Sequence, residues 1–471
     1  MSASSPLLGS HKNDSQYGSV APPIRTGATT SENTSADSSF ADPNDGHSVA
    51  NAAKKERIAL YTLAWSFFLL GWVDGSIGPL LPAMQAHYQI GYTVISIIFV
   101  SGCVGFVIAS VLNIYLTDKF GFGKIIVFSA ICEIVSFALQ ASAPSYPLMV
   151  LAFAINGFAF SLQDSQCNGF VVQLSTGVDA KLGVLHAIYG LGAFCAPLVA
   201  TQFSHSPRYW SLHYLVSFGM AIVNLIALVI VFRLKNSADT LSELGVRIEQ
   251  TTALENSGKF LQMMKTPMVH VLAFFIFVYC GTEITIGGWA VTYILDVRHG
   301  GKASGYISSG FFGGLALGRV ALIWVNEKIG QRRVILLYTI IAIALEISVW
   351  RIPSLIENAI AISLIGLVLG PFFPICMSVA GEVLPRRLVV GSIGWISGFG
   401  TTGGSAFPFI TGALASKYGV KIMPPLLVGM TASMLILWLA VGFQKESLEK
   451  KNGVPTASAP GVVPAIGSTS S

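Results

Sequence analysis

Charged residues are scarce in this sequence. Aspartate, glutamate, lysine and arginine make up 11% of the 471 residues, whereas hydrophobic residues make up 53%. Soluble domains usually carry about 25% charged residues, so a soluble protein of this length could not cover its surface. The mean hydropathy of +0.66 therefore predicts that lipid solvates much of the chain.

Several catalytic and binding motifs are also missing. The sequence has no phosphate-binding lysine loop, no serine nucleophile elbow and no histidine or cysteine spacing typical of a metal site. Its 6 cysteines stand singly in apolar runs. We therefore expect neither an enzyme nor an ATP-driven pump, and no cofactor or metal. The net charge of +5 is spread through the loops, which argues against a nucleic-acid partner.

Long apolar runs are what the sequence does have. Most contain about 20 residues, enough for a helix to cross roughly 30 Å of hydrocarbon. They predict an all-α membrane protein with twelve transmembrane helices in a lipid bilayer. The runs are Ala59–Met84, Thr93–Leu116, Ile125–Gln140, Leu148–Leu174, Leu182–Gln202, Leu212–Phe232, Met268–Tyr293, Tyr306–Val325, Val334–Trp350, Asn358–Val383, Gly391–Ala415 and Met423–Phe443.

Polar segments divide the chain. Residues 1–52 and 445–471 have few large apolar side chains and are predicted to be disordered tails. A polar linker, 235–265, separates a predicted six-helix bundle at 53–234 from a second at 266–444. This arrangement is typical of a duplicated transporter.

A repeated spacing supports the duplication. The separation from Asp74 to Glu283 equals that from Asp118 to Glu327 and that from Gly121 to Gly330. We therefore expect two six-helix pseudo-repeats with matching acids and matching turns.

Lysine and arginine predict the orientation. They gather in the short loops on one side, for example at Lys119, Lys124, Arg332 and Arg333. Cytoplasmic loops carry this excess, so we expect both termini and the linker in the cytosol. We expect a monomeric multi-pass protein, in the plasma membrane rather than the vacuolar membrane.

Asp74 and Glu283 are the leading functional candidates. A charge at the bilayer centre costs roughly 2.5–3.5 kcal/mol on insertion scales, and buried acids in membrane helices often relay protons. Asp74 lies between Gly71 and Gly75, which allow close helix approach or local unwinding. We interpret both acids as proton-coupling residues, and Trp289 as a ring that could stack on a substrate.

Two further helices carry candidate substrate groups. Asp164 and Asn168 share a helix face by their spacing, with Gln163 beside them. Amides and acids suit a polyhydroxylated ligand, which needs many donors and acceptors. His186 and Tyr189 follow on the next predicted helix. We expect Asp164 to take part in proton coupling, and the amides, His186 and Tyr189 to bind substrate.

The repeated loops predict a gate. Asp118 with Gly121, and Glu327 with Gly330, combine an acid with a turn glycine at a helix end. We assign these four residues to gating. Arg319 lies deep within a predicted helix and must be paired or solvated. We group it with the gate and expect Glu283 or an acid of the first half as its partner.

Two more acids fall within predicted helices. Glu346 lies near the exofacial end of its helix, so we expect its carboxylate to reach water. The sequence leaves the role of Glu133 open.

The repeated loop motif resembles the signature of the major facilitator superfamily. A finer resemblance, to the fungal members of the fucose–proton symporter branch, rests on four segments: Gly71-Trp72-Val73-Asp74-Gly75, Gly157 through Asn168, His186-x-x-Tyr189-Gly190-x-Gly192-Ala193, and Gly370-Pro371-Phe372-Phe373-Pro374. The resemblance implies the major facilitator fold. It also implies roles for Asp74 and Asp164 in proton coupling and sugar recognition.

These observations favour a proton-coupled secondary transporter that moves a small polar organic solute, with a sugar preferred, by alternating access. Two alternatives stay open. One is a proton-driven exporter of a secondary metabolite or drug, and the other is a membrane nutrient sensor that does not transport.

Overall fold

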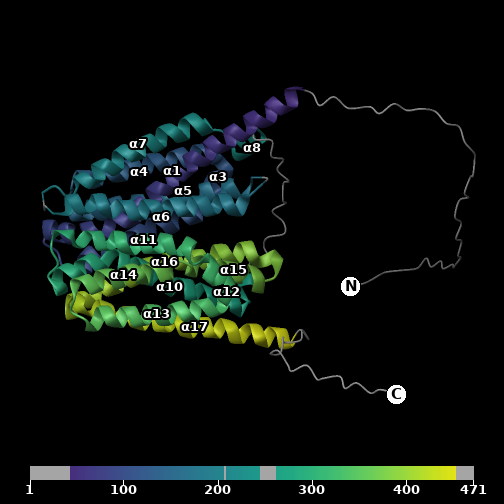
Figure 1. The fold of residues 1–471 in the computed structure, drawn as a ribbon. Coiled ribbons are helices and arrows are strands. Elements are labelled where there is room, and N and C mark those ends of the chain that lie inside the picture. Colours follow the sequence, from purple (N-terminus) through teal and green to yellow (C-terminus); the bar gives the residue numbers. More distant parts are fainter. Residues whose placement is uncertain (1–42, 175, 206–207, 244–260, 452–471) are drawn as a thin grey trace, which may run out of the picture. The chain divides into compact units, whose positions relative to one another are not determined.

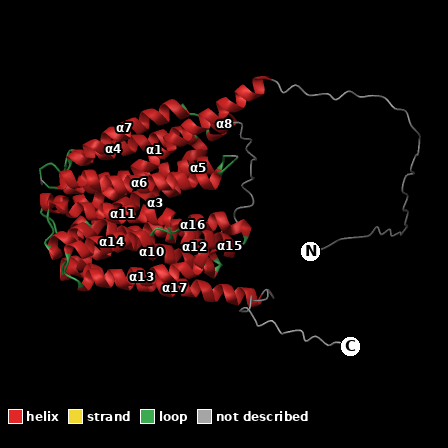
Figure 2. Ribbon diagram, in the orientation of Figure 1, coloured by secondary structure: helices red, strands yellow, loops and turns green. Residues whose placement is uncertain are grey.

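The computed structural model describes residues 43–174, 176–205, 208–243 and 261–451. Within these ranges the chain is helical and contains no β-strand (Figure 2). By its contacts the chain divides into Met1–Ser48 and Val49–Ser471, and the description below concerns the second unit.

The elements follow one another as shown in Figure 1. They are α1 (Pro43–Tyr88), α2 (Tyr92–Ile95), α3 (Ile97–Phe120), α4 (Phe122–Ala141), α5 (Tyr146–Val172), α6 (Val178–Ser204), α7 (Leu212–Phe232), α8 (Ser237–Glu243), α10 (Pro267–Arg298), η2 (Lys302–Gly305), α11 (Tyr306–Ala321), α12 (Ile323–Ile329), α13 (Gln331–Arg351), α14 (Leu355–Leu369), α15 (Phe372–Val383), α16 (Arg386–Tyr418), η3 (Val420–Ile422) and α17 (Met423–Lys451).

The protein is an all-helical membrane protein. Among the described residues, 10 helices are long and apolar enough to cross a membrane, or up to 11 if the pair Lys302–Ala321 and Ile323–Ile329, bent by 53°, forms one span. The remaining predicted span, Gly391–Ala415, lies within the 33 residues of α16. This helix is long enough to cross, but its glycine, serine and threonine residues make it less apolar than the others.

The predicted tails lie mostly outside the described residues, but their inner boundaries differ from the prediction. Helix α1 already begins at Pro43, before the predicted tail ends at 52, and α17 continues to Lys451, past the predicted boundary at 445. Lysine and glutamate make up most of the extension of α17, and the extension of α1 contains Ala50 and Ala52. These residues have high helix propensity, so polarity alone did not end the helices.

The matching loop glycines make matching turns. Gly121 connects α3 to α4 with φ of 82°, and Gly330 connects α12 to α13 with φ of 92°. A residue with a Cβ atom is strained in this region. At Gly121 a Cβ would also lie 1.8 Å from Oδ1 of Asn236. The repeat therefore preserves the chain reversal that each half needs at this point.

The predicted linker begins with a short docked helix. In α8, Leu241 is fully buried in an apolar cluster of the first half together with Phe122, Phe170 and Phe232. Residues 244–260 of the linker lie outside the described part of the chain. The beginning of the linker thus packs on the first bundle instead of extending into solvent.

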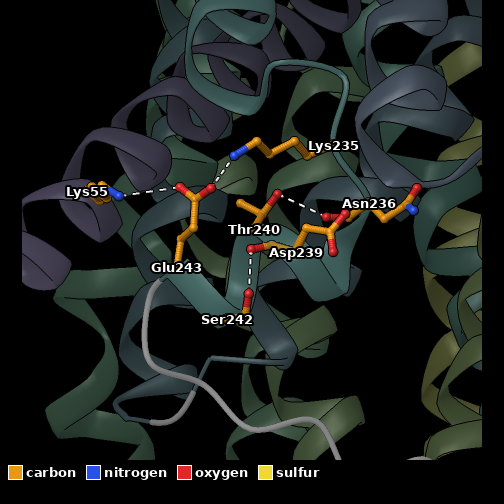
Figure 3. Close-up of polar contacts among 7 residues, drawn as sticks. All are labelled: Lys55, Lys235, Asn236, Asp239, Thr240, Ser242 and Glu243. Carbon is orange, nitrogen blue, oxygen red and sulfur yellow. Dashed lines mark hydrogen bonds and ion pairs between the residues drawn. The ribbon is translucent and has the colours of Figure 1, made fainter.

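An exposed ionic cluster accompanies α8 (Figure 3). Glu243 accepts a hydrogen bond from Lys235, and its other oxygen lies 3.3 Å from Nζ of Lys55 in α1. These hydrogen bonds, with Lys235 first and Lys55 second, hold the pKa of the Glu243 carboxyl below its usual value. The cluster connects α8 with the beginning of the first membrane helix.

The helical bundle has two ends, called the linker end and the far end. The linker end contains α8 and the turns at Gly121 and Gly330, and the far end contains the end of α1 at Tyr88 and the end of α10 at Arg298. The main apolar cluster includes residues of both halves, for example Phe99 and Phe311. The two halves therefore share part of their core.

Candidate functional site

Helix α1 runs without a break through Asp74. The glycines on either side of this acid pack against the backbone of α6. A Cβ atom at Gly71 would lie 1.9 Å from the carbonyl oxygen of Tyr189, and one at Gly75 would lie 2.3 Å from that of Ala193. These glycines therefore allow α1 and α6 to approach closely, and α1 is not unwound at Asp74.

This close approach brings Asp74 to a residue of the next candidate group. The hydroxyl of Tyr189 in α6 donates a hydrogen bond to the carboxylate of Asp74. Gly192 adds to the fit from the α6 side, because a Cβ there would lie 2.1 Å from the carbonyl oxygen of Phe68. The structure thus joins a predicted proton-coupling acid and a predicted substrate residue in one interaction.

The second half contributes Glu283 from α10 and Arg319 from α11. Gly78 of α1 and Gly287 of α10 let the halves meet closely, since a Cβ at Gly78 would lie 2.1 Å from the Gly287 carbonyl oxygen. Asp74 and Glu283 are near enough to repel each other, and Arg319 attracts Glu283.

Tyr279 completes this group, although sequence analysis missed it. It lies one turn before Glu283 on α10, and it interacts electrostatically with both Glu283 and Arg319. Its hydroxyl is buried and makes no hydrogen bond of normal geometry within the described residues, as is also true of Nε of Arg319. We call Asp74, Tyr189, Tyr279, Glu283 and Arg319 the seam cluster.

His186 lies one turn before Tyr189 on α6. Its side chain is exposed, its ring packs edge-on against Phe67 at 5.3 Å, and it interacts electrostatically with Arg319. Among the predicted substrate residues, His186 and Tyr189 are therefore the two that the structure brings to the seam cluster.

Asp164 and Asn168 form a separate pair on α5. Nδ2 of Asn168 donates to Oδ1 of Asp164 at 3.0 Å, and both side chains are half-buried. The predicted sharing of a helix face is found, but the structure does not join this pair to Asp74.

Gln163 belongs to a buried network inside the first half. Its Nε2 donates to Glu133 of α4 at 2.9 Å, and its Oε1 accepts from Asn224 of α7 at 3.1 Å. Asn224 in turn accepts a hydrogen bond from Ser66 of α1 at 2.8 Å. The amide group of Gln163 is thus occupied in holding four helices together, away from the seam cluster.

Trp289 is also fully buried. Its Nε1 donates to the carbonyl oxygen of Pro408 in α16 at 3.0 Å, and its ring packs edge-on against Tyr92 at 5.9 Å. These contacts make Trp289 part of the core between α10 and α16, where its ring faces are covered by protein.

The predicted gate acids lie at the linker end. Asp118 and Glu327 are both exposed, close to the turns at Gly121 and Gly330. Arg319, which was grouped with them, instead belongs to the seam cluster, where Glu283 is the partner that the sequence suggested.

Hydrogen bonds between the two halves gather at the far end. Tyr92 donates to Asp296 with 2.6 Å between the oxygens, and the backbone N–H of Thr93 donates to Oγ of Ser416 at 2.8 Å. These residues escaped sequence analysis because single tyrosines, threonines and serines near helix ends are common and carry no distinctive spacing.

A further bond of this kind links α6 to α11, where Nε2 of Gln202 donates to the hydroxyl of Tyr306. Close packing accompanies it, because a Cβ atom at Gly305 would lie 2.2 Å from Oγ1 of Thr201. The far end is thus closed by contacts that cross between the halves.

Comparison with known proteins identifies the family. Residues 63–386 match the family described as Major Facilitator Superfamily. The chain belongs to the major facilitator superfamily. Members of this superfamily are secondary transporters and not enzymes, so the protein is a membrane transporter that binds a small-molecule substrate.

Individual relatives are more distant. The chain is 27% identical over 402 residues to Bypass of stop codon protein 6 of Saccharomyces cerevisiae, covering 79% of this chain and 80% of that protein. It is 22% identical over 404 residues to a glucose/galactose transporter of Brucella abortus, covering 80% and 93%. The crystal structure of a D-xylose-proton symporter superposes with a TM-score of 0.67 at 12% identity, covering 81% of this chain and 97% of that one.

Proposed function

We propose that this transporter couples proton movement to the transport of a small, polar, uncharged solute, with a sugar favoured. The observation that carries the proposal is the seam cluster, in which Asp74 is bonded to Tyr189 and lies near Glu283, and Glu283 in turn interacts with Arg319. The sugar preference is supported by the names of distant relatives, a glucose/galactose transporter and a D-xylose-proton symporter. It also agrees with the resemblance to the fucose–proton symporter branch.

The charges of the seam cluster favour a proton carrier. The cluster contains two carboxyl groups and one guanidinium group, and only an ionised carboxylate can balance Arg319. If both acids were ionised, one negative charge would remain uncompensated in the membrane, where an unpaired charge is costly. Binding one proton makes the cluster neutral. Asp74 is the better proton site because Arg319 pairs with Glu283.

Proton binding would then bias the conformational cycle. With Asp74 protonated, its repulsion of Glu283 disappears, which stabilises the contact between α1 and α10 relative to conformations in which the two acids lie farther apart. The far-end contacts of Tyr92 with Asp296 and of Thr93 with Ser416 are the bonds that opening on that side would break. The exposed turns at Gly121 and Gly330 are proposed as the corresponding gate at the linker end.

Substrate contacts are proposed from side chains that still have polar groups to offer. Tyr189 belongs to the seam cluster and His186 adjoins it, and Asp164 with Asn168 provides a second polar pair. The polar groups of Gln163 and Trp289 already make buried hydrogen bonds, so a direct role for them requires these bonds to break.

Uptake into proteoliposomes tests the proposal. Wild type and Asp74→Asn are reconstituted, and accumulation of labelled neutral monosaccharides is measured with and without an imposed pH gradient. We expect gradient-driven accumulation for wild type, and for the variant only equilibration to the level without a gradient. Asp239→Asn, an exposed acid of α8, is the matched control and should behave as wild type.

The same assay separates the alternatives. Accumulation only under the reversed gradient would favour export. Binding of a sugar without flux or proton movement would favour a sensor. Gradient-driven accumulation that persists in Asp74→Asn would remove Asp74 from the mechanism.

A further inference from the structure

The second half contains a buried acid that the proposed mechanism does not use. Glu346 of α13 is 1% exposed, contrary to the expectation that it reaches water near its helix end. Glu346 lies near the far end of α13, but its side chain points into the bundle. The finding matters because a buried acid away from the seam cluster must be stabilised by its own surroundings.

Glu346 has few polar partners. Its Oε1 accepts a hydrogen bond from Oγ1 of Thr431 in α17 at 2.7 Å. Its Oε2 is buried and has no hydrogen-bond partner among the described residues. A buried ionised carboxylate needs a charged partner or several donors, because its desolvation is otherwise prohibitive. One hydroxyl donor is far from sufficient.

A small cavity adjoins the carboxyl group. Its volume is about 10 Å³, and apart from Glu346 it is lined mainly by apolar side chains of α10, α13, α14 and α17, among them Ile286, Val349, Ile365 and Leu427. This volume is close to the minimum that holds one water molecule. The space is thus too small for a sugar, and its apolar walls offer no second polar partner to a water molecule.

Ionisable groups on the neighbouring helices are engaged elsewhere. On α10, the hydroxyl of Tyr293 donates to the carbonyl oxygen of Val349 at 3.2 Å, and Arg298 donates to Asn358 at 2.8 Å. On α14, Glu357 accepts a hydrogen bond from Ser348. From Met423 to Gly442, α17 contains no ionisable residue.

The remaining neighbours of α13 meet it near the linker end. Glu382 of α15 lies 3.9 Å from Arg332 at the beginning of α13. In α12, Glu327 and Lys328 are exposed. The positively charged groups on these neighbouring helices therefore have other partners or face solvent, and none of them supplies a counter-ion for Glu346.

We propose that Glu346 is a proton-binding site separate from the seam cluster: its carboxyl group is protonated at neutral pH and directs its O–H toward the adjoining apolar cavity. In this arrangement Oε1 is the carbonyl oxygen that accepts from Thr431, and Oε2 carries the proton. The apolar walls retain the proton because its loss would leave a charge without a partner.

The first half also contains a buried acid, but its surroundings differ from those of Glu346. Glu133 lies on α4, the helix that corresponds to α13 in the repeat, and is 2% exposed. Measured from the matching turns at Gly121 and Gly330, Glu346 lies one helical turn further along, which keeps the same helix face. Glu133, however, accepts from the amide of Gln163 and belongs to a connected network. The cavity and the unpartnered oxygen distinguish Glu346.

Infrared spectroscopy of the purified full-length protein in lipid nanodiscs tests this proposal. A protonated carboxylic acid has a carbonyl stretching band that an ionised carboxylate lacks. At pH 7, we expect wild type minus Glu346→Gln to give a positive band in the carboxylic-acid region. Glu382→Gln, which removes an exposed acid, should give none. A wild-type minus Glu346→Gln spectrum without the band would show that Glu346 is ionised and would overturn the proposal.

A second variant keeps the test decisive if Glu346→Gln does not fold. Thr431→Val removes the donor to Oε1 and leaves the acid in place. We expect the carboxylic-acid band to persist and to shift to higher frequency, because its carbonyl loses a hydrogen bond. A spectrum identical to wild type would contradict the assignment. Since no transport is measured, the result does not depend on whether the proposed function is correct.

Discussion

The hydrogen bond from Tyr189 to Asp74 makes a quantitative prediction. The bond stabilises the ionised form of Asp74, and a hydrogen bond to a charged group contributes about 1.5–3 kcal/mol. The variant Tyr189→Phe removes the donor with little change in volume. The ionised form then loses this stabilisation while the protonated form loses less, so Asp74 holds its proton more tightly.

Tyr189→Phe is therefore expected to change the pH dependence of uptake. Tighter proton binding means that loss of the proton requires a higher pH, so the pH midpoint of proton-coupled uptake moves upward. Since one pH unit corresponds to 1.36 kcal/mol, the shift should be roughly one to two pH units. The assay is initial uptake in proteoliposomes over a pH series, with the inside and outside pH changed together.

Tyr61→Phe is the matched control, since Tyr61 also belongs to α1 but is 73% exposed. It should leave the midpoint unchanged. If Tyr189→Phe lowers the maximal rate but leaves the midpoint in place, Tyr189 acts on substrate or packing and not on the proton of Asp74. A downward shift would refute the reasoning outright.

Three further predictions follow from the packing and from the far-end contacts. Gly75→Leu should lower the thermal unfolding midpoint and abolish uptake, because its Cβ would lie 2.3 Å from the Ala193 carbonyl oxygen and overpacking costs about 1–3 kcal/mol. A wild-type unfolding midpoint and wild-type uptake would contradict this. Tyr92→Phe should weaken closure of the far end by about 1.5–3 kcal/mol, because it removes the hydroxyl that donates to Asp296. Thiol labelling of single-cysteine variants at the far end should then become faster, and an unchanged labelling rate would argue against a closing role for this bond. Leu241→Ala should reduce the free energy of unfolding by about 2–5 kcal/mol, as measured by chemical denaturation; a change well below this would mean that α8 contributes little to stability.

Much of the fold is predictable from the sequence for a simple physical reason. A helix that crosses hydrocarbon must satisfy its backbone internally and present apolar side chains over about 20 residues. That requirement makes runs such as Leu212–Phe232 visible, and here the predicted run and α7 coincide. The repeat was equally visible, and Gly121 and Gly330 adopt the same positive φ region.

The direction of individual side chains was harder to predict. In a soluble helix, hydrophobic periodicity separates the buried face from the exposed face. In a membrane helix, lipid and protein interior are both apolar, so this signal largely disappears. The sequence predicts that Trp289 is available to substrate, but the structure buries it against Pro408. Glu346 was expected to reach water, yet it points into the second half.

Adjacent polar residues posed a related problem. Gln163 and Asp164 follow each other in sequence, so their side chains point in directions about 100° apart around the helix. Gln163 enters the buried network with Glu133, whereas Asp164 is half-buried and pairs with Asn168. Reading the polar segment as one patch combined two different environments. The sequence signal for this network is an acid within a predicted membrane span, Glu133, together with amides within other spans, Gln163 and Asn224.

The repeat also explains why its two halves play different parts in the seam cluster. Asp74 and Glu283 occupy matching positions, but the position that matches Arg319 in the first half is Ser110. Ser110 lies at hydrogen-bond distance, 2.8 Å, from Ser161 and can offer no positive charge. Duplication therefore supplied two acids while divergence supplied a single arginine. An arginine in both halves would have neutralised both acids permanently, and none in either half would have left both charges unbalanced. One arginine for two acids leaves a single negative charge, which is the imbalance that one exchangeable proton can correct.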